Sequence, residues 1–447
     1  MIDRVLDTAR RRRGGHGGHG GHGADALWRR EERTAVAFES GRLKTAAVTA
    51  EAGTNLRVLA GGRVGVAGTT AAAPDAEALV DRARASAELS EPLDLAFPPM
   101  SVVPRVSTFF DRAAGASLDQ LVRMGRGLLE RLTRDGCQVN VSVEREVAET
   151  AVGNTAGARG GYRSTGVAVT AELLRIAGDD VLMVYDQYVG ADLPADADLD
   201  AVARSIETRL EPALTVVTPP EGALPVIFTP AGLAAVLLPF EQALSGKTVL
   251  QGSSPLVGKV GEQAFDPRLS ITDDPLAPGR ATSRPLDDEC VPSGTTYLVQ
   301  RGVVQRFVYD LETAARAGTQ STGHGRRGIF GKPRIGYTNL IIGTGDGGPG
   351  TGALGGGLLD GIADGLLVDD LIGVGQGNVI GGAFSHPVAL AYRVQRGEVT
   401  GRVKDAAVAG NAYDLVKRIG GVGSDGRWLG ARWSPSLLLE GVSVARR

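Results

Sequence analysis

The 447-residue chain contains few cysteines, few aromatic residues and no long apolar run. Two cysteines, Cys137 and Cys290, are too few for a disulfide scaffold and suit a reducing compartment. The most apolar window, 226–240, is interrupted by Pro230 and is too short to span a bilayer. No apolar segment of signal-peptide length follows the basic N-terminal run. We therefore expect a cytoplasmic protein that makes no membrane contact.

The chain also lacks an excess of charge of either sign. Its 48 basic and 51 acidic residues give a net charge of −3, which argues against a surface built to bind nucleic acid. Apolar residues make up 43% of the sequence, so a full core can form without metals or disulfides. Because only 5% of residues are aromatic, that core must consist mainly of Val, Leu, Ile and Ala.

Glycine, in contrast, is abundant. The 64 glycines are about twice the usual share of ~7%, and they show no period of three, which excludes collagen. Many tight turns between strands are the expected result. One Gly-rich tract, 14–23, places His16, His19 and His22 three residues apart. It is either a small metal-binding tract or a low-complexity insertion, and we interpret it as an insertion without function.

Hydrophobic periodicity predicts an α+β fold in two domains. A Pro-rich stretch at 211–224 marks the boundary between an N-terminal mixed α/β domain (1–212) and a C-terminal β-rich domain (220–447). Gly61 and Gly62 favour a hairpin between two short strands in 56–70. Helices are expected at 75–91, 117–132, 198–210, 231–243 and 411–418. Further strands are expected at 139–143, 166–176, 181–188, 225–229, 296–300, 303–309 and 337–342.

Several short motifs resemble nucleotide-binding or catalytic motifs, but the flanking residues that such sites need are missing. The GxGxxG string at 343–348 is not followed by a helix start, and 245–248 resembles a P-loop end with Glu241 where glycine is required. GxSxG and HExxH are absent, so a Ser-His-Asp triad would have to use His324 or His386 in a constellation that the sequence does not specify.

Two acidic clusters are candidates for a cation site. Asp273–Asp274 and Asp287–Asp288–Glu289 could hold Ca²⁺ or Mg²⁺ through oxygen ligands, or could form turns paired with Arg280 and Arg284, which we favour. Cys290 beside the second cluster is a poor nucleophile, because neighbouring negative charge destabilises its thiolate.

Several strings together resemble the TldD/PmbA (TldE) family, long labelled modulators of DNA gyrase and understood as subunits of a zinc peptidase. They are LRVLAGGRVGVAGTT (56–70), ETAVGNTAG, SGKTVLQGSSPLVGKVGE, SITDDP, SRPLDDE, RGVVQRFVYDLETAARAG, YTNL and DGLLVDDLIG. Their order and spacing make the match specific over nearly the whole chain. Two departures are the GGH repeats and Cys290, which stands where the family usually has glycine.

The resemblance also assigns a branch. Catalytic TldD-type chains carry HExxxH on the short helix after the strand at 225–229, with both His binding zinc and the Glu activating water. The matching window here has Phe240, Glu241 and Ser245, and the stretch 423–433 lacks the cysteine ligand of the TldD type. The chain is therefore similar to the PmbA/TldE type, with no catalytic residue and no metal of its own.

This branch implies a heterodimer with a TldD-like subunit that carries the zinc, acting on unfolded or leader-type peptides, in a specialised biosynthetic pathway. As candidates for cleft-lining residues we take Asp287, Asp288, Glu289 and His324. Two alternatives remain open at this point: a stand-alone peptide- or metabolite-binding protein of the same fold, and a divergent hydrolase without the zinc motif.

Overall fold

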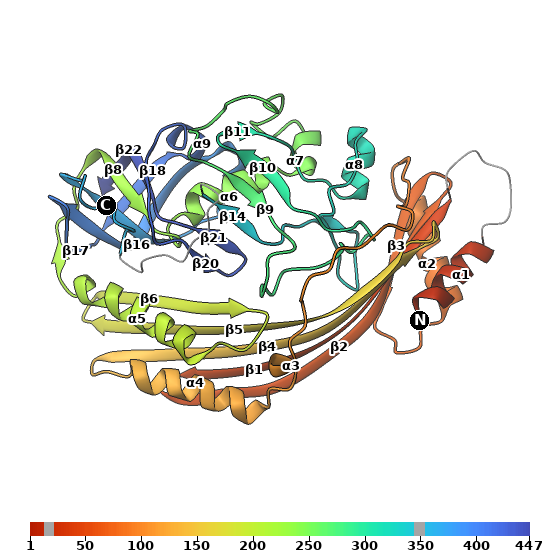
Figure 1. Ribbon diagram of the computed structural model, residues 1–447, viewed down its shortest axis with the longest axis horizontal. Coiled ribbons are helices and arrows are strands. Elements are labelled where there is room, and N and C mark those ends of the chain that lie inside the picture. The colour runs from red at the N-terminus through yellow and green to blue at the C-terminus, as the bar shows by residue number, and fades with distance from the viewer. Residues whose placement is uncertain (13–21, 344–353) are drawn as a thin grey trace.

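A strongly curved antiparallel sheet forms the N-terminal part of the computed structural model, which describes residues 1–12, 22–343 and 354–447 (Figure 1). Its strand order is β3-β2-β1-β4-β5-β6, and its longest strands have 19 residues. The strands are β1 (Gly23–Glu39), β2 (Arg42–Ala60), β3 (Arg63–Thr69), β4 (Cys137–Asn154), β5 (Arg159–Ala177) and β6 (Asp180–Gly190).

Helices pack on this sheet at two places. At one end, α1 (Ile2–Arg11) and α2 (Ala76–Glu88) bury apolar stripes against β1 and β2, and Asp75 caps α2 by accepting from two backbone N–H groups. Along the sheet, α4 (Leu118–Leu132) and α5 (Asp196–Ala213) join the core formed by β1, β4, β5 and β6. A short helix, α3 (Asp111–Ala114), precedes α4.

The C-terminal part is built on two more sheets. In the larger, the order is β15-β8-β22-β18-β16-β17-β7, with β19 paired to β22, and in the smaller it is β11-β10-β9-β14-β21-β20. The larger sheet contains β7 (Val216–Val217), β8 (Gly222–Phe228), β15 (Asp364–Leu371), β16 (Ala383–Gln395), β17 (Glu398–Val403), β18 (Ala406–Asn411), β19 (Ile419–Val422) and β22 (Leu437–Arg446). The smaller contains β9 (Ile271–Asp273), β10 (Thr296–Gln300), β11 (Val303–Val304), β14 (Leu340–Ile342), β20 (Arg427–Leu429) and β21 (Arg432–Ser434).

The helix α6 (Ala234–Ala243) contributes to the apolar core that both of these sheets share, so it is enclosed by the C-terminal part of the chain. The remaining elements are α7 (Gly246–Leu250), α8 (Leu311–Ala317), α9 (Ala412–Leu415), a 3-10 turn η1 (Val379–Gly381) and the ribbon of β12 (Gly325–Arg326) with β13 (Arg334–Ile335).

Buried charges and apolar side chains cross between the N- and C-terminal parts. On α5, Arg209 pairs with Asp186 of β6 at 3.3 Å and with Asp369 of β15 at 2.8 Å. Tyr392 of β16 donates a hydrogen bond to the Arg209 carbonyl, and Leu367 lies in the same core as the N-terminal strands. The two parts are therefore packed as one body.

The fold class expected from the sequence, α+β with a β-rich C-terminal region, is confirmed. The hairpin is also confirmed, with Gly61 and Gly62 at φ 60° and 70° between β2 and β3. Three expected elements were too long: 303–309 keeps only β11, 337–342 keeps only β14, and 411–418 keeps only α9. The domain boundary at 212–220 stays a prediction. Within the described residues, no helix has the length and apolarity to cross a membrane.

Candidate functional site

The window that resembles a degenerate zinc motif lies on α6 and the turn after it. Phe240 is 1% exposed and packs its ring against Phe265 and Tyr413, each with ring centroids 5.1 Å away. Ser245 follows the end of α6, directly before α7, where its backbone bridges to Val308. Position 240 is thus part of the apolar core.

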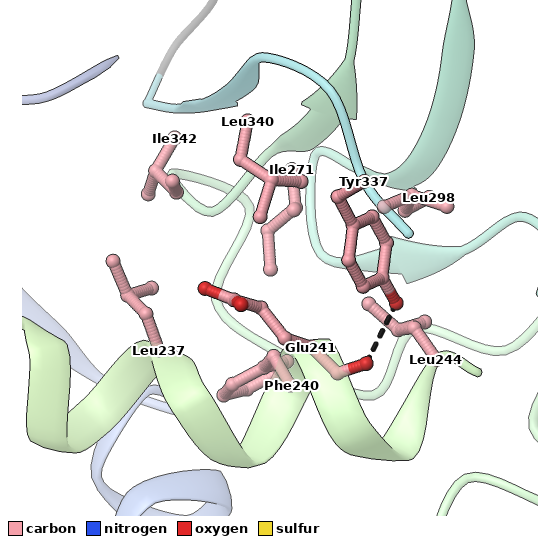
Figure 2. A pocket seen from close by; sticks show the side chains of 9 residues that line it. All are labelled: Leu237, Phe240, Glu241, Leu244, Ile271, Leu298, Tyr337, Leu340 and Ile342. Carbon is pink, nitrogen blue, oxygen red and sulfur yellow. Dashed lines mark hydrogen bonds between the residues drawn. The ribbon is translucent and has the colours of Figure 1, made fainter. Parts of the chain in front are cut away.

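Glu241 is held by two contacts from the C-terminal part of the chain. Its Oε1 lies 2.6 Å from Nη2 of Arg432, at the start of β21, and its carbonyl accepts a hydrogen bond of 2.7 Å from the Tyr337 hydroxyl. In Figure 2 the carboxylate points into a small pocket whose other lining side chains are mostly aliphatic. The carboxylate is therefore already engaged in an ion pair within the chain.

These residues do not fit a zinc ion. Phe240 has no donor atom, and zinc sites are formed by Cys, His and carboxylate ligands. Within the described residues, no group of three or more His, Cys, Asp and Glu side chains gathers as a metal site would. Arg432 comes from the segment 423–433, where the sequence lacks the expected cysteine, and the cation that it contributes would repel a metal ion.

The acidic run 287–289 lies in the interior. All three residues are at most 1% exposed, and so is His324. The expectation that they line a cleft stays a prediction. The expected pairing with Arg280 is corrected, because Asp288 pairs with Arg29 at 3.1 Å and Glu289 with Arg57 at 2.6 Å. Arg284 does lie near Asp287, where its charge opposes the burial that raises the pKa of that carboxyl.

A buried network of charges surrounds Glu289. Arg57 of β2 contacts Asp25 of β1 at 2.5 Å as well as Glu289, and Arg327 contacts Asp25 at 2.9 Å. Burial, with the nearby charges of Asp287 and Asp310, raises the pKa of Glu289 to about 8 even though the Arg57 cation opposes this shift. For Asp25 the two arginines outweigh burial and lower the pKa. The network joins strands of the N-terminal sheet to loops of the C-terminal part.

Cys290 completes this buried turn in a conformation that favours glycine. Its φ is 68°, in the left-handed region that glycine adopts without steric cost. Burial raises the pKa of the thiol to about 12, with the Asp25 and Asp287 charges acting in the same direction. The thiol is therefore unreactive, as the sequence suggested.

His324 forms a buried pair with Asp273 of the other acidic cluster. Its Nε2 lies 3.1 Å from Asp273 Oδ2, and its Nδ1 lies 2.9 Å from both the carbonyl and the hydroxyl oxygen of Thr322. Asp273 also accepts hydrogen bonds from Thr338, and although burial opposes ionisation, His324 and Thr338 lower its pKa. The Thr322 hydroxyl contacts the Tyr309 backbone, so it is not free to act as a nucleophile.

Other candidate motifs carry no site. The GxGxxG string lies almost wholly outside the described residues, as do His16 and His19 of the Gly-His tract. His386 lies on β16, paired with Val408 of β18. Arg57, Arg432 and Tyr337 are contacts that sequence reasoning missed. All three lie in segments quoted for the family resemblance, but nothing in those segments indicates which distant residues they contact.

Known proteins resemble this chain both in sequence and in fold. A model described as the PmbA/TldA metallopeptidase C-terminal domain matches residues 221–446, and one described as PmbA/TldA metallopeptidase domain 1 matches residues 24–87. The crystal structure of TldE from Thermococcus kodakarensis superposes with a TM-score of 0.87 and 23% identity, covering 99% of both chains.

Sequence relatives match over a shorter length. A "Metalloprotease" of Methanothermobacter thermautotrophicus is 29% identical over 53% of this chain and 51% of its own length. A "Metalloprotease TldD homolog" of Haemophilus influenzae is 30% identical over 50% of this chain and 46% of its own length. The matched region thus spans about half the length of these curated relatives. With the C-terminal family model matching half of the chain, this protein belongs to the PmbA/TldD family.

Proposed function

We propose that this chain is the non-catalytic, TldE-like subunit of a heterodimeric TldD/TldE-type zinc peptidase that processes unfolded or leader-type peptides. The proposal rests on the environment of residues 240–245, the segment that matches the zinc-binding motif of TldD-type chains. Phe240 occupies a ligand position with a buried ring, and the Glu241 carboxylate is neutralised by Arg432. Neither residue can serve a zinc-bound water in this arrangement.

In this proposal the zinc belongs to the partner subunit. A catalytic zinc site needs about three protein ligands and an open position, and the partner's HExxxH helix with its C-terminal cysteine would supply them. The present chain would stabilise the partner and shape the space in which the peptide is held. Likeness to a TldE structure supports this division of roles.

Co-expression with a TldD-like chain tests the proposal directly. We expect a complex with one zinc per pair, cleavage of an unfolded peptide by the pair, and no cleavage by this chain alone. Zinc content and mass of the purified complex, with peptide hydrolysis followed by mass spectrometry, measure all three. Cleavage by this chain alone, or failure of the two chains to associate, would overturn the proposal.

A further inference from the structure

The connection between α2 and α3 contains an extended segment whose backbone has no partner. In the described part of the chain, no N–H or C=O group from Val102 to Ser107 takes part in a hydrogen bond. The segment is anchored just beyond its end, where the Thr108 carbonyl accepts from the Thr165 N–H and the Thr108 hydroxyl donates to the Arg163 carbonyl. Val102 itself is 93% exposed. A solvated, extended backbone of this kind can pair with another extended chain.

This segment forms one wall of an open groove. Residues 103–107 face Gly161 and Tyr162 of β5, with Pro285 from the C-terminal part, around a volume of about 490 Å³. In Figure 1 the orange connection between α2 and α3 crosses in front of the curved sheet, below the C-terminal part. The groove therefore has an unpaired backbone on one side and small or aromatic residues on the other, as a peptide-docking groove requires.

One wall of the groove carries a positively charged side chain. Arg105 is exposed, and no acidic side chain pairs with it in the described residues. Burial and the Asp288 charge raise the pKa of the Tyr162 hydroxyl, although the nearby Arg284, Arg29 and Arg326 oppose this shift. Arg284 is buried and Arg29 is paired with Asp288, so Arg105 is the charged side chain among the residues that line the groove.

We propose that this groove is a docking site for an acidic peptide in extended conformation, whose backbone pairs with residues 103–107. This proposal rests on the proposed function, because a TldE-like subunit of a peptidase would hold a peptide. Binding itself requires neither zinc nor a partner subunit. Backbone pairing would accept many sequences, and the exposed Arg105 would favour a carboxylate side chain.

Peptide binding to the full chain alone tests the site. The probe is a fluorescein-labelled peptide of about eight residues alternating Glu and Thr, with two comparison peptides: one with Lys in place of Glu, and one N-methylated on alternate residues. We expect saturable binding of the acidic peptide by fluorescence anisotropy, and about tenfold weaker binding of each comparison peptide, because each loses either charge attraction or backbone hydrogen bonds.

Two matched variants locate the binding. Ser107→Trp fills the groove at an exposed position that makes no side-chain hydrogen bond within the described chain, and it should weaken binding about tenfold or more. Val102→Trp places the same bulk just outside the groove and should bind as the unmodified chain does. Thermal unfolding of both variants checks that each is folded.

The outcomes separate this site from the proposed function. No saturable binding at about 1 mM protein, or equal binding of the N-methylated peptide, overturns the docking site, and so does unchanged binding by folded Ser107→Trp. If the docking site fails while the two-chain complex still cleaves peptide, the proposed function stands alone. If binding follows the expected pattern but no active complex forms, the docking site stands and the proposed function fails.

Discussion

Arg432 Nη2 lies 2.6 Å from Glu241 Oε1, so the acidic residue that matches a catalytic base has an arginine as its immediate partner. The two residues are 191 positions apart in sequence, on α6 and β21. In a zinc peptidase the corresponding carboxylate must take a proton from water. Here its charge is satisfied within the chain.

Glu241→Gln should therefore have little effect. Both side chains of the pair are about a quarter exposed, and pairs of this kind contribute roughly 0–1 kcal/mol. We expect the free energy of unfolding to change by less than about 1 kcal/mol, and peptide cleavage by the two-chain complex to persist. The same change in the partner's HExxxH glutamate should abolish cleavage. Loss of cleavage from Glu241→Gln in an intact complex would assign chemistry to this subunit.

Restoring both histidines should not create a zinc enzyme. Phe240→His with Ser245→His replaces a ring that packs between Phe265 and Tyr413, and loss of that packing should cost about 2–4 kcal/mol. Denaturant unfolding measures the cost, and zinc titration calorimetry measures affinity, with Ser245→His alone as the control. Tight zinc binding together with peptide turnover by the double variant would contradict this expectation.

Arg57 should be among the most sensitive charged positions. Arg57→Met removes one of the two cations that pair with the buried Asp25 carboxylate, and it leaves the Glu289 carboxyl without its Arg57 partner, a change that typically costs about 3–5 kcal/mol. Arg393→Met is the matched control, because its pair with Asp364 is partly exposed and should contribute roughly 0–1 kcal/mol. Urea denaturation compares the two. Equal, small losses would show that the buried network adds nothing to stability.

The stability of the chain should fall as pH rises above about 4.5. The pKa of Glu289 is raised from its ordinary 4.5 to about 8, so the folded chain keeps a proton that the unfolded chain releases. This contribution is complete below pH 4.5 and is lost as pH rises to about 8.

Glu289→Gln is the direct check of this pH dependence. The amide keeps the shape of the protonated acid and does not titrate, so the slope of unfolding free energy between pH 5 and about 8 should become shallower. Some slope should remain, since burial also raises the pKa of Asp287. An unchanged slope in Glu289→Gln would mean that Glu289 is ionised throughout this range.

Local patterns predicted the elements that are stabilised locally. Asp75 and Ser117 cap α2 and α4 where the sequence placed helix starts, and the hairpin at Gly61 and Gly62 follows the turn chemistry of those residues. The length of β2 was missed because its residues 42–51 are all exposed, and alternation of apolar and polar residues is absent where neither face is buried.

The site could be only partly predicted for a related reason. Resemblance located Phe240 and Glu241, but Arg432 approaches Glu241 through tertiary pairing of β14 with β21, which no local pattern encodes. Residues 287–289 are three consecutive acidic residues, a pattern that is typical of an exposed turn. Their burial depends on arginines supplied by β1 and β2, more than 230 residues earlier.

Buried ion pairs join residues near the start of the chain to residues of the C-terminal part. These pairs limit which chimeric proteins could fold. Asp25 and Arg57 lie in the segment 24–87 that matches domain 1 of the family. Glu289 and Arg327 lie in the segment 221–446 that matches the C-terminal domain. A chimera that takes one half from a distant relative would bring together arginines and carboxylates from different networks, leaving unpaired charge in the interior. The two halves therefore need to be exchanged together, even though each matches its own family model.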